Sequence, residues 1–149
     1  MRYLLVDRIT EWQKDTLIKG IKNIAMSEDF LEFHFPDRPV MPGVMLLEAL
    51  VQLSGWLTAV SSDFKKWFVL TNIKQCKFYS FALPGDQVYL TIEKIYTHEG
   101  STFRGLGAVG DKKKIAVDFS GEMINLEEIE DADKQRQVFN IMTRQDSWR

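Results

Sequence analysis

The sequence contains little cysteine and proline and has almost no excess charge of either sign. Its single cysteine, Cys76, cannot close a disulfide within the chain, which excludes a secreted scaffold held by disulfides. The 19 Lys and Arg residues against 21 Asp and Glu lack the basic excess of a dedicated nucleic-acid-binding protein. Only four apolar residues stand together before Asp7, too few for a signal peptide. We therefore expect a cytoplasmic protein without a nucleic-acid partner.

The composition is that of an ordinary globular domain. Hydrophobic residues make up 45% and charged residues 27% of the 149, which excludes disordered and collagen-like chains. The length fits one domain of ~100–200 residues, and no linker divides the chain. Residues 127–149 are acidic at first and then helix-like, with Val138, Ile141 and Met142 at helical spacing. We expect a single domain over residues 1–149, with 127–149 as a C-terminal extension.

One long apolar run, residues 44–60 (VMLLEALVQLSGWLTAV), contains no Lys or Arg. It is shorter than the ~20 residues of a membrane span, and Glu48 and Gln52 in its middle would be costly in a bilayer. Pro42 and Gly43 stand where a helix can begin, since the first turn does not need the missing proline N–H. The run therefore predicts a buried helix of a soluble protein, without membrane insertion.

The rest of the chain predicts strands. Three of the four prolines (Pro36, Pro39, Pro42) make residues 30–42 an irregular loop. Turn residues at 84–86, 99–101 and 110–111 separate short runs typical of hairpin strands. The predicted strands are residues 3–9, 16–26, 68–77, 87–96, 102–109 and 114–124. Consecutive strands joined by short turns indicate an antiparallel sheet.

A helix that is apolar on nearly every side must be buried. The predicted strands are the only elements of the chain that can cover this helix. The sequence therefore predicts an α+β fold with a long central helix wrapped by a curved antiparallel sheet. Because so few strands cannot cover the helix completely, we expect a second copy of the chain to close the remaining surface.

Two polar residues share one stripe of this helix. Glu48 and Gln52 are four residues apart, and Gly55 follows at the next turn. A carboxylate on an apolar helix needs a partner or protonation. Glu48 is thus either a structural carboxylate with a buried partner or a carboxyl group that serves as an acid.

His34 precedes the helix, in Phe33-His34-Phe35-Pro36. A histidine between two phenylalanines is often only a core residue, but the loop DRPVMPG leads from it directly to the helix that carries Glu48. A helix N-terminus offers unpaired N–H groups, and Gly43 there has no side chain to obstruct them. A base, an acid and an anion-stabilising N–H on one segment indicate proton abstraction next to a carbonyl.

The segment HFPDRPVMPGVMLLEALVQ, residues 34–52, resembles the signature of the FabZ-type 3-hydroxyacyl-[acyl-carrier-protein] dehydratases. Residues 4–8 (LLVDR) and 20–23 (GIKN) resemble the opening strands of that family, and residues 77–87 and 103–117 resemble its central hairpin and later strands. The resemblance covers residues 3–125. A long motif with fixed spacing is much more specific than a short glycine pattern.

The resemblance implies a hot-dog fold and a homodimer, alone or as a trimer of dimers, with active sites shared between subunits. It implies dehydration of (3R)-3-hydroxyacyl thioesters, carried on the phosphopantetheine of acyl carrier protein, to trans-2-enoyl thioesters without a metal or redox cofactor. His34 would be the base and Glu48 the acid for the leaving hydroxyl. The Gly43 N–H would bind the thioester oxygen, and Gln52 would orient Glu48.

The sequence departs from the family pattern at Phe33 and Asp37, where the family has glycine. These changes bear on rate and substrate choice. Two other interpretations stay open: a hot-dog acyl thioesterase, and a catalytically weak acyl-binding hot-dog subunit. Cys76, His34 and His98 lack metal-ligand spacing. The basic residues that could steer an acidic carrier protein to the site are Arg38, Lys65, Lys66, Arg104, and Lys112 to Lys114 at an expected exposed hairpin tip.

Overall fold

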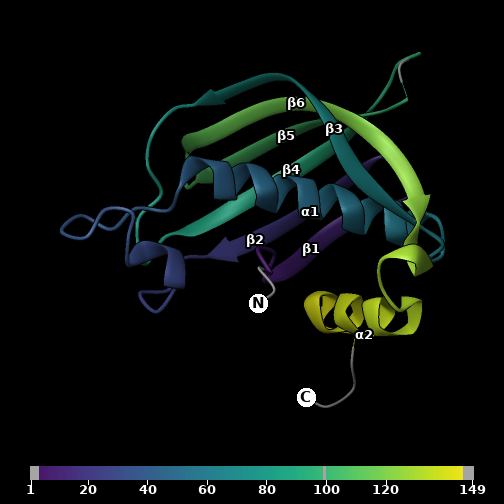
Figure 1. Ribbon diagram of the computed structural model, residues 1–149, viewed down its shortest axis with the longest axis horizontal. Helices are drawn as coiled ribbons and strands as arrows, with labels where there is room; N and C mark the ends of the chain where they lie inside the picture. Colours follow the sequence, from purple (N-terminus) through teal and green to yellow (C-terminus); the bar gives the residue numbers. More distant parts are fainter. Residues whose placement is uncertain (1–3, 99, 146–149) are drawn as a thin grey trace.

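The computed structural model describes residues 4–98 and 100–145, and these form an α+β fold (Figure 1). Tyr3 and Glu99, parts of a predicted strand and turn, lie outside the described residues, as do residues 146–149 of the extension. The elements are β1 (Arg8–Gln13), β2 (Leu17–Asn23), the 3₁₀ turn η1 (Asp29–Leu31), α1 (Gly43–Ser61), β3 (Lys66–Phe78), β4 (Gln87–Tyr96), β5 (Ser101–Val109), β6 (Lys112–Asn125), η2 (Leu126–Glu128) and α2 (Ala132–Thr143).

All six strands form one antiparallel sheet in the order β1-β2-β4-β5-β6-β3. The predicted hairpin between the strands at 68–77 and 87–96 is wrong, because β3 pairs with β6 and β4 pairs with β2. The reason is the helix: α1 carries the chain across the sheet from β2, so β3 starts at the opposite edge. The first strand is also shifted, since β1 spans Arg8–Gln13 whereas the predicted strand covers residues 3–9.

The predicted core helix is confirmed. α1 lies in the hollow of the curved sheet, with β3 and β6 arching over it (Figure 1). By length and composition alone α1 could cross a membrane, but more than half of its apolar window is buried inside the fold. Its second half is almost entirely enclosed, as Leu53, Trp56 and Leu57 show.

The first half of α1 differs from the prediction of a helix without a solvent-facing side. Val44 is 65% exposed, Glu48 is exposed, and Leu47 and Val51 are only partly buried. The strands cover one side of this half, and no element in the described part of the chain covers the other. In a single chain, α1 therefore presents an open, mainly apolar face.

Beyond β6, the chain turns through η2 and packs α2 below β1 (Figure 1). Asp131 caps α2: its Oδ1 accepts hydrogen bonds from the N–H groups of Asp133 and Lys134 at 2.9 and 3.2 Å. Phe139 is 3% exposed and its ring contacts the rings of Trp12 and Trp56, with centroids 6.1 and 6.2 Å apart. The helical spacing expected for this extension is confirmed, and the extension is part of the packed core.

Candidate active site

His34 and the start of α1 share one cavity of about 440 Å³. His34 comes from the proline-rich loop, Gly43 and Val44 come from the first turn of α1, and residues 78–82 form the facing wall. The facing wall is largely aromatic, because Phe78 ends β3 and Tyr79 and Phe81 follow it. This cavity, which we call the His34 cavity, joins the predicted base to the predicted N–H donor.

The loop fixes the orientation of the His34 ring. The Nδ1 atom lies 3.3 Å from the carbonyl oxygen of Val40, and the Val40 N–H donates to the His34 carbonyl at 2.9 Å. A carbonyl oxygen can only accept a hydrogen bond, so Nδ1 is the donor, and in the neutral ring Nε2 then carries the lone pair. The ring also stacks on Phe35, with centroids 4.6 Å apart. This tautomer leaves Nε2 as the atom that can accept a proton.

Gly43 is the first residue of α1, with Pro42 in the N-cap position. Among the residues that the structure describes, the Gly43 N–H makes no hydrogen bond. A Cβ atom at this position would lie 2.8 Å from the Phe78 ring, so glycine lets Phe78 pack over the helix end. The result is a backbone donor at the positive end of the helix dipole, beside the His34 cavity.

Glu48 is held by a short chain of hydrogen bonds. The Leu5 N–H donates to Gln52 Oε1 at 3.0 Å, and Gln52 Nε2 donates to Glu48 Oε1 at 3.1 Å. The Leu5 N–H is an obligate donor, so it sets which way the Gln52 amide points and turns the NH₂ group toward the carboxylate. Glu48 is exposed in the single chain.

A second cavity of about 290 Å³ lies beside Glu48. Glu48, Gln52 and Trp56 line it from α1, Trp67 lines it from β3, and residues after β6 close it. Gly55, on the same stripe, has no room for a side chain, because a Cβ atom would lie 2.3 Å from the Trp67 ring. We call this space the Glu48 cavity.

The two candidate catalytic residues do not meet within one chain. His34 lines one cavity and Glu48 lines the other, and neither residue lines both. The carboxylate side chain of Glu48 opens onto the exposed face of α1. Within one chain, His34 and Glu48 therefore do not form an acid–base pair.

Phe33 and Asp37, which depart from the family pattern, do not line either cavity. Phe33 is 78% exposed, and neither Phe33 nor Leu47 is among the residues that line the His34 cavity. Phe35 and Val44 do line it. Asp37 sits in a turn closed by the Arg38 N–H, which donates to the Phe35 carbonyl at 3.0 Å, and its φ is not left-handed. Aspartate thus fits this turn without strain.

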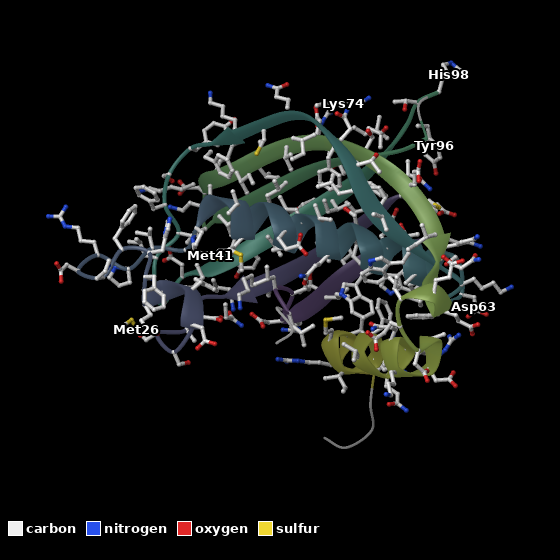
Figure 2. All side chains as sticks on the ribbon, viewed as in Figure 1. Met26, Met41, Asp63, Lys74, Tyr96 and His98 are labelled. Atoms are coloured by element: carbon white, nitrogen blue, oxygen red, sulfur yellow. The ribbon has the colours of Figure 1, made fainter. Side chains whose placement is uncertain are left out.

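The other candidates lie apart from both cavities. His98 is exposed at the end of the β4–β5 hairpin and points away from the sheet (Figure 2). Arg38, Lys65, Lys66 and Arg104 are exposed, as expected for steering residues.

The expectation that Lys112 to Lys114 form an exposed hairpin tip is wrong for Lys114. It is 8% exposed, and its Nζ donates to the Phe81 carbonyl at 2.9 Å and contacts Ser80 Oγ at 3.1 Å. Of the three lysines, only Lys112 and Lys113 are exposed.

Burial raises the pKa of the Cys76 thiol on β3. Within residues 4–98 and 100–145, no group of three or more His, Cys, Asp or Glu side chains could hold a metal ion.

Sequence reasoning missed much of both cavity walls. The aromatic run at 78–81 was a visible signal, but its position opposite His34 depends on β3 pairing with β6. The wall formed by Trp67 and Gln135 had no local signal, because these residues come from distant elements.

Comparison with known proteins agrees with this geometry. Residues 1–118 match the model of the FabA-like domain family. The 3-hydroxyacyl-[acyl-carrier-protein] dehydratase FabZ of Nitratidesulfovibrio vulgaris (strain DSM 19637 / Miyazaki F) is 46% identical over 91 residues, which cover 59% of this chain and 59% of that protein. The FabZ dehydratase of Histophilus somni (strain 2336) is 37% identical over 110 residues, covering 72% of this chain and 73% of that protein.

A solved structure shows the fold. The fluoroacetyl-CoA thioesterase FlK matches with a TM-score of 0.63 and 13% identity, covering 85% of this chain and 97% of that one. Together with the central helix and the six-stranded antiparallel sheet, this likeness confirms the expected hot-dog fold. The family match ends at residue 118, so α2 lies beyond it. By the match over residues 1–118, the chain belongs to the FabA-like domain family.

Proposed function

We propose that this protein dehydrates (3R)-3-hydroxyacyl thioesters carried on acyl carrier protein to trans-2-enoyl thioesters, in fatty-acid or related lipid biosynthesis. The observation that carries the proposal is the His34 cavity, where an imidazole with a free Nε2 lies beside the unpaired Gly43 N–H. The FabZ relatives, named as 3-hydroxyacyl-[acyl-carrier-protein] dehydratases, support the same reaction.

In this mechanism His34 is the base. Its Nε2 takes the proton from C2 of the acyl chain, and the electrons of that C–H bond move to the thioester oxygen. The enolate oxygen accepts a hydrogen bond from the Gly43 N–H, which the helix dipole strengthens. The contact with Val40 keeps the ring in the tautomer that this step needs, and it stabilises the proton that remains on Nδ1.

Glu48 is the acid in the second half of the reaction. The enolate re-forms its carbonyl, C2 and C3 become doubly bonded, and the C3–O bond breaks. The Glu48 carboxyl gives its proton to the departing hydroxyl, which leaves as water. The Gln52 amide orients the carboxyl through its 3.1 Å hydrogen bond, so Gln52 acts as a positioning residue. Before the next turnover, His34 loses the proton that it took up and Glu48 regains one.

The active unit is a homodimer in this proposal. His34 and Glu48 line different cavities, and the half of α1 that carries Glu48 has an open apolar face. β3 beside it is an edge strand with exposed apolar side chains, including Val69 and Ile73. A second copy that covers this face would bring His34 of one subunit to Glu48 of the other. Exposed apolar area of this kind is typical of an interface.

The remaining features of the proposal follow from the same chemistry. The substrate arrives on the phosphopantetheine of acyl carrier protein in the cytoplasm, and the exposed basic residues Arg38, Lys112 and Lys113 steer the acidic carrier to the site. No cofactor takes part in the proposed steps. Residues 1–149 act as one domain.

The test is incubation of the purified protein with a 3-hydroxyacyl-acyl-carrier-protein thioester, followed by mass spectrometry. Loss of one water from the acyl chain is the result that we expect. Release of the free hydroxy acid would instead identify a thioesterase. An unchanged substrate would identify a catalytically weak acyl-binding subunit.

A further inference from the structure

Lys114 is a buried lysine whose partners line the His34 cavity. It is 8% exposed, and its Nζ donates to the Phe81 carbonyl at 2.9 Å and to Ser80 Oγ at 3.1 Å. Both acceptors are neutral, and among the residues that the structure describes no carboxylate pairs with this ammonium. Because burying a charge without a counter-ion is costly, the arrangement indicates a role that an apolar side chain could not fill.

A β-bulge in β6 turns this side chain inward. Gly107 of β5 pairs with Ile115 of β6. The next residue of β5, Ala108, pairs with Lys113, so Lys114 is the extra residue of the bulge. Successive side chains of a regular strand point to opposite faces, yet Lys114 and Ile115 are both buried. The local backbone of β6 therefore directs the ammonium toward the wall of the His34 cavity.

Backbone hydrogen bonds join this wall to the loop that carries His34. The Met41 N–H donates to the Ala82 carbonyl at 2.9 Å, one residue beyond the carbonyl that Lys114 binds. Val40 precedes Met41, and its carbonyl oxygen lies 3.3 Å from His34 Nδ1. A displacement of the wall would thus move the atom that fixes the His34 tautomer.

We propose, on the basis of the proposed dehydratase function, that Lys114 is a positioning residue for His34. Its ammonium fixes the backbone of residues 80–82, and the bridge from there to Met41 keeps the Val40 carbonyl against Nδ1. The Nε2 atom then stays free to take the proton from the acyl chain. Without the ammonium, the hydrogen bond from Nδ1 weakens and the ring adopts more of the Nε2–H tautomer, which cannot accept a proton at Nε2.

Nitrogen-15 NMR of the imidazole rings tests this link without any turnover. The chain has two histidines, so a His98→Ala variant assigns both rings, and His98 serves as the internal reference. We expect neutral His34 to carry its hydrogen on Nδ1 in the wild type. Lys114→Met should shift the ratio of the two neutral tautomers about fivefold toward Nε2–H, the effect of one weakened hydrogen bond. The signals of His98 should not change.

Steady-state kinetics with a 3-hydroxyacyl-acyl-carrier-protein thioester give a second readout. In Lys114→Met we expect kcat to fall by about tenfold, because the base is no longer held in its reactive orientation. KM should change little, because the aromatic side chains of the cavity wall remain. A residue that only supported the wall would change KM instead.

Lys94→Met is the matched control, because Lys94 is a lysine of β4 with a 15% exposed side chain that lines neither cavity. It should leave the His34 tautomer ratio unchanged. Ser80→Ala removes one acceptor of the ammonium and replaces Lys114→Met if the latter does not fold; we expect a smaller shift in the same direction.

Three results would overturn the proposal: an unchanged His34 tautomer ratio in the tested variant, an equal shift in Lys94→Met, or a loss of activity confined to KM. A wild-type protein that does not dehydrate the thioester would overturn only the proposed function, since the NMR signals report the His34 ring itself.

Discussion

The His34 cavity and the Glu48 cavity divide the proposed chemistry between two differently built regions. The His34 cavity comes from neighbouring segments, a proline-rich loop, the start of α1 and residues 78–82, all inside the family match. The Glu48 cavity joins the middle of α1 to β3 and to a segment after residue 118. The proposed base and the proposed oxyanion donor are thus close together in the sequence, whereas the surroundings of the proposed acid include this chain's own extension.

The largest expected effect comes from removing either proton-transfer group. His34→Ala and Glu48→Gln should each lower kcat for dehydration by about 10²–10⁴-fold while the protein stays folded. The measurement is the rate of enoyl thioester formation, with circular dichroism to confirm the fold. His98→Ala is the matched control for the histidine, because His98 is exposed at the β4–β5 hairpin. A folded variant with near-normal turnover would remove that residue from the mechanism.

The second prediction concerns α2, which contributes Gln135 to the Glu48 cavity. Phe139→Ala should lower the free energy of unfolding by about 3–5 kcal/mol, because a buried ring that contacts three aromatic side chains is lost. Chemical denaturation measures the change. Ile141→Ala on the exposed side of α2 is the control and should have little effect. Equal stability of the two variants would show that α2 is not anchored through Phe139.

Gly43→Val probes the His34 cavity. The new side chain keeps the N–H but occupies the space beside it, and it must displace the Phe78 ring, which is half exposed. We expect kcat to fall by about 10²–10³-fold, the effect of losing one oxyanion donor. The double variant Gly43→Val/Phe78→Ala relieves the clash with the ring, so an activity loss that persists in it comes from blocking the substrate. Full activity of the folded Gly43→Val protein would place the thioester elsewhere.

The smallest effect concerns the segment that leads to His34. Lys22 is 3% exposed and its Nζ lies 2.6 Å from Glu28 Oε1 and 3.5 Å from Asp7 Oδ2. Lys22→Met should cost about 1–3 kcal/mol of folding stability, because Glu28 and Asp7 both lose this cation. Lys19→Met, which breaks the exposed pair with Glu11, should cost less than about 0.5 kcal/mol. Thermal denaturation compares the two, and equal shifts would mean that burial adds nothing to the Lys22 pairs.

The sequence was informative where the signal is local. The apolar run predicted α1, and turn residues predicted the ends of β4. Of the predicted site, His34 and Gly43 line one cavity, whereas Glu48 lines another. The pairing of β3 with β6 could not be predicted, because it depends on how α1 carries the chain across the sheet. The exposure of Glu48 could not be predicted for the same reason. Glu48 lies on an apolar helix, and the arrangement of the whole sheet determines which side of that helix the strands cover.

The most direct test of the central claim, that each active site is shared between two copies, is subunit mixing. Inactive His34→Ala and inactive Glu48→Gln are exchanged under conditions that allow dimers to re-form, and dehydration is then measured. Random exchange makes about half of the dimers mixed, each with one intact site, so about a quarter of wild-type activity should return. A mixture that exchanges fully, shown by mass spectrometry of the intact dimers, and yet stays inactive would contradict the account.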